Sequence, residues 1–275
     1  MKRVLSIVAL LVTVACSSSS PPSATSSGAP GASSSGGAPE DDGTPAETST
    51  AFQSYVILGD SISDRGGSGP YFYDLLGEDL KTKLGDVKVV KNSKSGARSV
   101  GLPGQVSTLP EALPGPVAVS VTIGGNDMQA AALEILNGTD EKSRAAFTAN
   151  LTKAYDELTR EGRFGEGVKV TIFHATIYDP TDGEGNFAEA GCGGYLAALP
   201  KQPTRGYWDN WNNAAADVLA KYGDAVVTVD MRAKFEGHGV GKLKEGTSWF
   251  DPDCIHPNTT GHDEIRKLFL GAIAP

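Results

Sequence analysis

Five short, mostly apolar runs recur along the chain and constrain its fold more than any other feature. They cover residues 55–58, 87–90, 117–123, 168–173 and 226–229. Runs of this length and composition are typical of strands that are buried on both faces of a parallel sheet. Segments with helical spacing or Gly and Pro residues separate them, as crossover connections require. The pattern therefore predicts a five-stranded parallel sheet.

The segments beside these runs carry the apolar spacing of amphipathic helices. They cover residues 71–84, 128–136, 142–160, 208–222 and 259–273. Helices on both faces of such a sheet give a three-layer α/β/α sandwich. Ligands bind beyond the carboxyl ends of the strands in open sheets of this kind, so the residues that follow each strand are the first candidates for a site.

The first fifty residues differ in composition from the rest. Lys2 and Arg3 precede an apolar stretch that ends at Cys16, the pattern of a secretory signal segment and too short to span a bilayer. Residues 12–16 resemble the lipobox of bacterial lipoproteins, which implies cleavage before Cys16 and acylation of that cysteine; a plain signal peptide is the alternative. Residues 17–50 lack large apolar side chains, which is typical of a flexible tether.

We therefore expect three parts in the chain. They are a signal peptide over residues 1–15, the lipidated cysteine with a disordered linker over residues 16–51, and one α/β domain over residues 52–275. This organisation places the protein at a bacterial cell envelope, attached to a membrane surface through its lipid, or outside the cell. Ser17 and Ser18 favour the outer membrane in a host that has one.

Cysteine usage points to one disulfide. With Cys16 set aside, Cys192 and Cys254 remain as an even pair in a chain that we expect to be exported. Two buried free thiols are the alternative, because free cysteine packs as a small apolar side chain.

Charge and composition exclude some classes of binding partner. The net charge is −9, from 24 basic and 33 acidic residues without a Lys- or Arg-rich run, so we expect no nucleic-acid partner. Residues 179–186 are rich in oxygen ligands but lack the acid spacing of a calcium-binding EF-hand loop. We expect no metal.

Residues suited to nucleophilic chemistry follow the predicted strands. Ser61 comes just after the first strand, Gly96 after the second and Asn126 after the third. Gly96 lets its backbone N–H approach a ligand, and the Asn126 amide is suited to donate to a developing oxyanion. Asp253 and His256 stand three positions apart in one loop before the last predicted helix.

A serine hydroxyl needs a neutral imidazole to accept its proton and a carboxylate to orient that imidazole. Among the four histidines, His256 has the best-placed carboxylate upstream. Asp251 also precedes His256, so either carboxylate could face the ring, and the spacing favours Asp253.

These residues, in this order, resemble the conserved blocks of the SGNH or GDSL hydrolases. The blocks correspond to residues 59–63, Gly96, residues 124–127, and Asp253 with His256. The resemblance implies a flavodoxin-like fold and ester hydrolysis without a metal or organic cofactor. It also implies the site residues: a triad of Ser61, Asp253 and His256, and an oxyanion hole made by the backbone N–H groups of Ser61 and Gly96 with the side chain of Asn126.

We expect a monomeric serine esterase or lipase that forms an acyl-enzyme on Ser61. Its substrate is a small-molecule, lipid or polysaccharide ester, and a carbohydrate O-acetylesterase of the same fold is the alternative. A non-catalytic, surface-binding lipoprotein is the alternative from another class. Five aromatic residues are candidates to line an acyl or sugar pocket, although we expect core packing for most: Tyr195, Tyr207, Trp208, Trp211 and Trp249.

Overall fold

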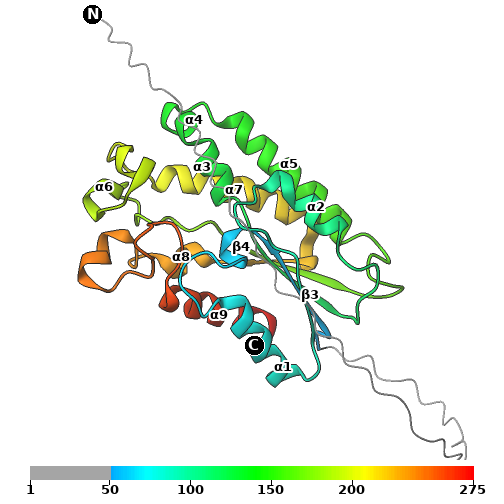
Figure 1. Cartoon of the computed structure of the whole chain (residues 1–275). Helices are drawn as coiled ribbons and strands as arrows, with labels where there is room; N and C mark the ends of the chain where they lie inside the picture. Colours follow the sequence, from blue (N-terminus) through cyan, green and yellow to red (C-terminus); the bar gives the residue numbers. More distant parts are fainter. Residues whose placement is uncertain (1–50) are drawn as a thin grey trace, which may run out of the picture. The chain divides into compact units, whose positions relative to one another are not determined.

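The computed structural model describes residues 51–275 and is built around one parallel sheet (Figure 1). The strand order is β2-β1-β3-β4-β5. This confirms the predicted five-stranded parallel sheet and α/β fold. The predicted signal segment and the acylation site at Cys16 lie outside the described residues. The strands are β1 (Ser54–Gly59), β2 (Lys88–Lys91), β3 (Val117–Thr122), β4 (Val170–Ala175) and β5 (Val226–Val229).

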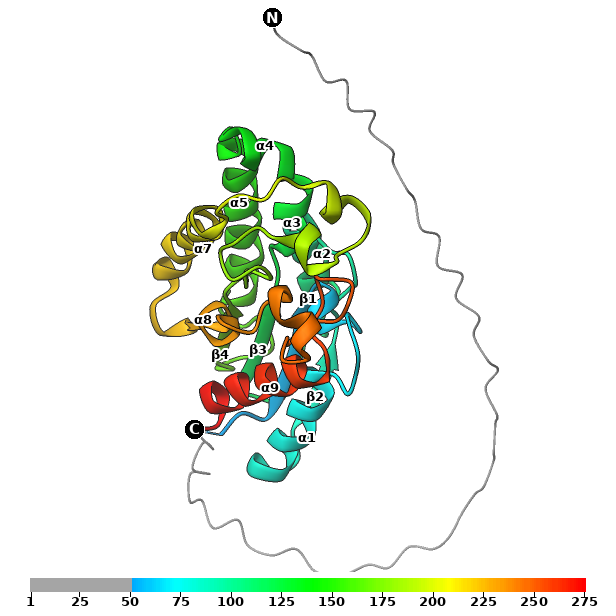
Figure 2. The same ribbon diagram turned by 90° about the vertical axis from the view of Figure 1, so that its left-hand side faces the viewer.

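Helices cover both faces of the sheet (Figures 1 and 2). The α1, α8 and α9 helices lie on one face, and α2, α5 and α7 lie on the other. The helices are α1 (Phe72–Leu84), α2 (Leu102–Ser107), α3 (Gly125–Ala130), α4 (Ala132–Asn137), α5 (Glu141–Leu158), α6 (Phe187–Ala190), α7 (Arg205–Leu219), α8 (Met231–Phe235) and α9 (Thr259–Ile273). Short 3-10 turns cover Ser61–Ser63, Ser99–Gly101, Gly194–Ala198, Ala220–Ala225 and Val240–Glu245.

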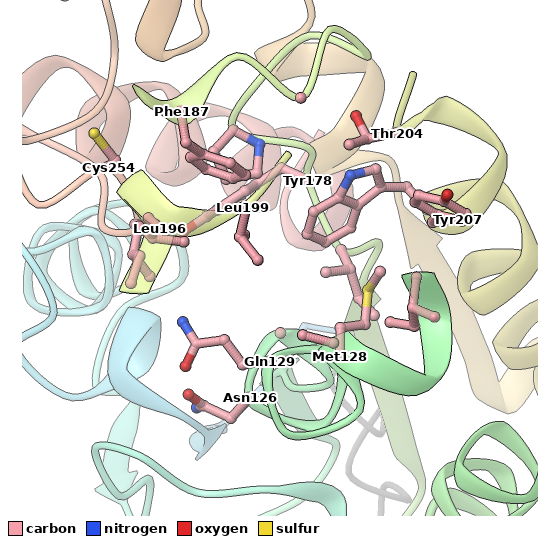
Figure 3. Close-up of a pocket in the computed structure, with 18 of the residues that line it drawn as sticks. Asn126, Met128, Gln129, Tyr178, Phe187, Leu196, Leu199, Thr204, Tyr207 and Cys254 are labelled. Carbon is pink, nitrogen blue, oxygen red and sulfur yellow. Dashed lines mark hydrogen bonds between the residues drawn. The ribbon is translucent and has the colours of Figure 1, made fainter. Parts of the chain in front are cut away.

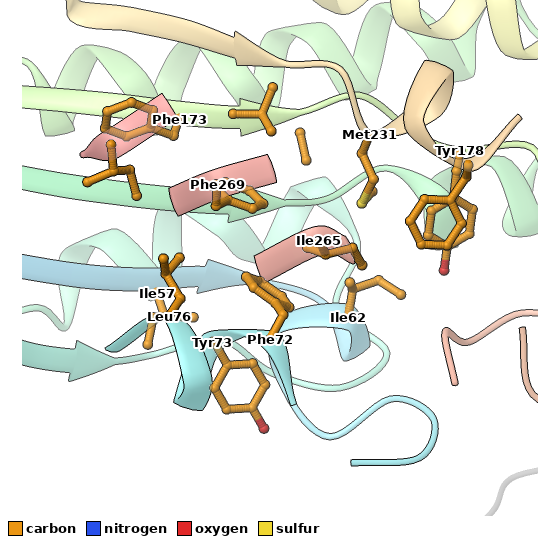
Figure 4. Packing of buried hydrophobic residues seen from close by; sticks show 14 of the residues in the cluster. Ile57, Ile62, Phe72, Tyr73, Leu76, Phe173, Tyr178, Met231, Ile265 and Phe269 are labelled. Atoms are coloured by element: carbon orange, nitrogen blue, oxygen red, sulfur yellow. The ribbon is translucent and has the colours of Figure 1, made fainter. Parts of the chain in front are cut away.

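Side-chain alternation along β1 produces the two cores. Tyr55 and Ile57 pack on the α1 and α9 side, with Phe72 and Phe269 (Figure 4). Val56 and Leu58 face the α2, α5 and α7 side. All residues of β1 and β3 are buried, because each of these strands has a strand on both sides and helices on both faces.

The helix predictions hold with one clear exception. The helix expected over residues 128–136 is two short helices, α3 and α4, and the first begins at Gly125. Ala131 separates them with φ −92° and ψ 8°, outside the helical range. The α2, α6 and α8 helices were not predicted, since four to six residues are too few to show a helical period.

Every helix within residues 51–275 is too short or too polar to cross a membrane.

Candidate active site

Ser61 begins a 3-10 turn directly after β1, at the carboxyl end of the sheet. Gly59, the last residue of the strand, has φ +124°, and a Cβ atom there would lie 2.0 Å from the carbonyl oxygen of Thr122 on β3. The side-chain amide of Gln105 pairs with both backbone groups of Gly59, each at 2.8 Å. The turn that carries Ser61 is therefore fixed by two neighbouring elements, β3 and α2.

His256 connects Ser61 to Asp253. Its Nε2 atom lies 2.9 Å from Oγ of Ser61, and its Nδ1 atom lies 2.6 Å from Oδ2 of Asp253. Asp251 does not face the imidazole, because its carboxylate accepts a hydrogen bond from Oγ of Ser68 at 2.9 Å. Of the two carboxylates that the sequence left open, Asp253 is the one that contacts His256.

The carboxylate of Asp253 is held in its charged form. Burial opposes ionisation, but hydrogen bonds from the His256 ring and from the backbone N–H groups of His256 and Ile255 lower the pKa of Asp253 below its ordinary value. An ionised carboxylate at hydrogen-bond distance from an imidazole is suited to orient the ring and to stabilise its protonated form.

Asp60 has the opposite environment. Burial raises the pKa of Asp60 from 3.8 to about 7, although hydrogen bonds from the Ile62 N–H and the Thr122 hydroxyl act in the other direction. Its carboxyl group caps the 3-10 turn that begins at Ser61. Asp60 therefore helps to fix the turn that carries Ser61.

The imidazole of His256 rests against a loop that has no room for a side chain. A Cβ atom at Gly66 would lie 2.5 Å from Cδ2 of His256. The carbonyl oxygen of Gly66 accepts a hydrogen bond from Nε2 of His262 at 2.8 Å. His262 is buried in α9 and thus anchors the loop that supports the other histidine.

Three groups suited to bind an oxyanion are present around Ser61. Asn126 lies in the first turn of α3, and one N–H of its side chain donates to the carbonyl oxygen of Ala97 at 3.0 Å, which leaves the other N–H available. Gly96 has φ +72°, a conformation that favours glycine. Among the described residues, nothing accepts from the backbone N–H of Ser61 or Gly96. Within residues 51–275, the backbone N–H groups of Ser61 and Gly96 and one N–H of the Asn126 amide are therefore not used by internal hydrogen bonds.

An apolar cavity opens beside Ser61 and Asn126 (Figure 3). It contains about 1170 Å³ of space not filled by protein atoms, including its open mouth. The walls come from α3 and α4, from the residues after β4, from the segment that contains α6 and the Gly194–Ala198 turn, and from the start of α7.

Three of the five aromatic candidates line this cavity: Tyr195, Tyr207 and Trp208. Tyr207, Trp208 and Trp249 are partly buried and pack against the core clusters, so most of the five pack in or against the core, as expected. Trp211 does belong to the core, where its Nε1 donates to Asp140 at 2.8 Å. Trp249 stacks on His238 with ring centroids 3.6 Å apart.

The predicted disulfide is present and joins Cys192 to Cys254. Cys254 stands between Asp253 and His256 in the loop before α9, and Cys192 follows α6 in the segment that forms one wall of the cavity. The bond therefore links the cavity wall directly to the loop that carries Asp253 and His256.

The oxygen-rich segment 179–186 has a structural role. Asp179 accepts hydrogen bonds from the hydroxyls of Thr181 and Thr204, and Asp182 accepts from two backbone N–H groups. Within residues 51–275, no group of three or more His, Cys, Asp or Glu side chains is placed to hold a metal ion.

Three supporting residues were not singled out from the sequence. Gln105 and Gly66 carry no local signal, because each acts on a residue that is distant or on another element. Tyr178, whose hydroxyl donates to the backbone of the catalytic loop, follows β4 by three residues. The rule that selects residues just after strands would have found Tyr178.

Comparisons with known proteins agree with this geometry. Residues 57–264 match the model of the GDSL-like lipase/acylhydrolase family. The crystal structure of Axe2, an acetylxylan esterase from Geobacillus stearothermophilus, is similar with a TM-score of 0.53 and 18% sequence identity, over 82% of this chain and 95% of that chain.

The lipase Lip_vut3 from a goat rumen metagenome is similar with a TM-score of 0.52 and 17% identity, over 80% of this chain and 96% of that chain. At these identities the two likenesses show a shared fold. A comparison with curated proteins finds no match. Because the family match spans the sheet and the loop that carries Asp253 and His256, the chain belongs to the GDSL-like lipase/acylhydrolase family and is an ester hydrolase.

Proposed function

We propose that Ser61 is the nucleophile of this ester hydrolase and forms an acyl-enzyme during turnover. The observation that carries the proposal is the continuous hydrogen-bonded chain from Asp253 through His256 to Ser61, with distances of 2.6 and 2.9 Å. This arrangement supplies the base that a serine hydroxyl needs to attack a carbonyl at neutral pH.

The first half-reaction transfers the acyl group to the enzyme. Oγ of Ser61 attacks the ester carbonyl carbon while Nε2 of His256 accepts the hydroxyl proton. The negative charge on the carbonyl oxygen is stabilised by the backbone N–H groups of Ser61 and Gly96 and by the amide of Asn126. The C–O bond then breaks, and His256 returns the proton to the leaving alkoxide, which departs as an alcohol.

The second half-reaction releases the acid. A water molecule attacks the acyl carbon as His256 removes its proton, and the same three N–H donors stabilise the new oxyanion. Collapse of the tetrahedral intermediate breaks the bond to Ser61, whose oxygen recovers its proton from His256. Asp253 remains ionised throughout and stabilises the imidazolium.

Labelling with a fluorophosphonate probe tests the nucleophile. We expect the wild type to be labelled and to hydrolyse p-nitrophenyl esters, and Ser61→Ala to lose both properties while it unfolds at the same temperature. Ser63→Ala is the matched control, since Ser63 lies in the same turn but its hydroxyl faces Thr122 at 2.8 Å. Labelling of Ser61→Ala would reject the assignment, and a wild type without labelling or hydrolysis would favour the non-catalytic lipoprotein.

The location of the protein is part of the proposal. Residues 1–16 and the tether after them support a chain that is exported, acylated on Cys16 and attached to the bacterial envelope through its lipid. Growth of the source cells with an alkyne fatty acid should label the wild type but not Cys16→Ser. We also propose that the mature protein is a monomer, which analytical ultracentrifugation checks.

Two substrate classes share this chemistry. The similar solved structures include an acetylxylan esterase and a lipase, so enzymes named for each of these two substrate classes share this fold. The triad and the oxyanion donors act on the ester group alone and do not distinguish these substrates. The cavity beside Ser61 is the part of the site that can.

A further inference from the structure

We propose that the apolar cavity beside Ser61 binds the long acyl chain of a lipid ester, so that the protein prefers acyl lipids to acetylated polysaccharides. This inference rests on the proposed function, because it assumes that the ester is cleaved at Ser61. It concerns a separate property, namely what the walls of the cavity recognise.

The lining of the cavity is almost entirely apolar. Aliphatic side chains of α3 and α4 form one wall, and Phe187, Leu196 and Leu199 face them from the segment near the disulfide (Figure 3). Asn126 and Gln129 of α3 contribute amide groups to the lining (Figure 3). Sugar hydroxyls placed against such walls would lose their hydrogen bonds to water without replacement, whereas a hydrocarbon chain loses none.

The cavity reaches beyond what an acetyl group attached to Ser61 could fill. Its lining continues from Ser61 and Asn126 to Leu136 and Trp208. An acetyl ester would place a single methyl group in this space and leave most of the apolar wall in contact with water. A long acyl chain would remove that wall from water along its length.

The direction of the cavity suits an acyl chain. Asn126 lies in the first turn of α3, and α4 continues away from it, so the apolar wall extends from the reacting carbonyl through Met128 and Ala132 to Leu136. A chain attached to the carbonyl carbon would follow this wall.

A second hollow lies beside Gly96 and is suited to the alcohol portion of the substrate. Most of the side chains that line it are polar or charged, including Asn92, Ser93, Lys94 and Arg98, while Ala97 and Val100 add apolar surface. The carbonyl of Ala97, which follows Gly96, accepts from Asn126, so the two hollows adjoin at the oxyanion groups. A lipid ester has this distribution of properties, with an apolar acyl chain on one side of the carbonyl and a polar alcohol on the other.

A series of p-nitrophenyl esters from acetyl to dodecanoyl tests the inference, because the leaving group stays constant. We expect kcat/KM to rise about fourfold with each added methylene until the cavity is filled. The octanoyl ester should therefore exceed the acetyl ester by at least about 100-fold. A purified phospholipid and an acetylated xylan then compare the two natural classes, and we expect the phospholipid to be the better substrate.

Two tryptophan variants test whether the cavity is responsible. Ala132→Trp places a large ring in the cavity and should lower the octanoyl-to-acetyl ratio of kcat/KM at least tenfold. Leu133→Trp is the matched control, because Leu133 is the next residue of the same helix, is 65% exposed and does not line the cavity. It should leave the ratio unchanged. Leu136→Trp replaces the first variant if thermal unfolding shows that Ala132→Trp does not fold.

The possible results distinguish failure of the acyl-chain inference from failure of the proposed hydrolase function. A wild type that is labelled at Ser61 but prefers the acetyl ester, or a ratio that no tryptophan in the cavity alters, overturns the inference and leaves the hydrolase intact. Absence of labelling together with absence of all ester hydrolysis rejects both.

Discussion

The hydroxyl group of Tyr178 donates a hydrogen bond to the carbonyl oxygen of Ile255 at 2.6 Å, across 77 positions of sequence. Ile255 immediately precedes His256, so this bond attaches the loop of the proposed catalytic base to the segment that follows β4. Tyr178 is buried and also packs against the rings of Phe235 and Phe250. The position of the imidazole therefore depends on a residue that does not touch it.

Tyr178→Phe should lower kcat/KM about tenfold, because loss of the hydroxyl allows the loop to shift His256 away from Ser61. The free energy of unfolding should fall by about 1 kcal/mol, the usual net value of a hydrogen bond. Tyr222→Phe is the control, since its hydroxyl also bonds to a distant helix, where the carboxylate of Asp156 lies at 2.8 Å and the carbonyl of Thr152 at 3.1 Å. It should lose similar stability and keep full activity. Equal loss of activity in both variants would contradict the positioning role.

Asp253→Asn should lower kcat by about 10⁴-fold, because an amide no longer holds the imidazole in the tautomer that accepts the proton of Ser61. Asp251→Asn should have less than a tenfold effect, since that carboxylate contacts Ser68 rather than His256. Steady-state kinetics on one ester measures both variants. A larger loss in Asp251→Asn would mean that the acid has been assigned to the wrong carboxylate.

Asn126→Ala should lower kcat by about 10²- to 10³-fold, the cost of removing one oxyanion donor. KM should change little, because the interaction develops only in the transition state. Asn150→Ala serves as the control, since its amide donates to Ser99 on a neighbouring segment and makes no contact at the site. A large rise in KM with unchanged kcat would instead assign Asn126 to substrate binding.

Asp60 makes the stability depend on pH. Its pKa is raised to about 7 in the folded protein, against 3.8 when unperturbed, so across this window the folded state holds a proton that the unfolded state has lost. The free energy of unfolding should therefore fall as pH rises from about 4 to 7, by at most about 4 kcal/mol from this group. Denaturant unfolding from pH 4 to 8 should show a smaller fall in Asp60→Asn than in wild type.

Asp86→Asn provides the comparison for this experiment, because Asp86 is exposed. It should follow the wild-type dependence on pH. If Asp60→Asn also follows the wild-type dependence on pH, the prediction is wrong. The carboxyl group of Asp60 is then ionised at low pH in the folded protein, because its hydrogen bonds lower its pKa more than burial raises it.

Much of the framework was predictable because it rests on local patterns. Buried strands of a parallel sheet are nearly continuous apolar runs, and for this reason β1 and β3 were recognisable. The α9 helix was predicted with its observed bounds, since Asn258 caps its first turn and the apolar spacing persists to Ile273. The order of Ser61, Gly96, Asn126 and the Asp253–His256 pair along the chain was enough to indicate an ester hydrolase.

The cavity was not predictable, because its walls come together only through the fold. Leu196 and Leu199 lie in a segment without periodicity, and no local pattern shows that they face α3 and α4. The spacing within the loop favoured Asp253 over Asp251, but the partner of Asp251, Ser68, lies 183 positions away in the sequence and was not predictable. Contacts between single residues of distant segments produce no recognisable pattern in the sequence of either segment.

Gly66 has a consequence for how this chain can change over evolutionary time. Any side chain at this position begins with an atom that would lie 2.5 Å from the ring of His256 and 2.6 Å from the carbonyl oxygen of Ser61. A substitution of Gly66 would therefore displace two residues of the proposed triad at once. In descendants of this gene, replacement of that glycine would be an early sign that selection for hydrolysis has been relaxed.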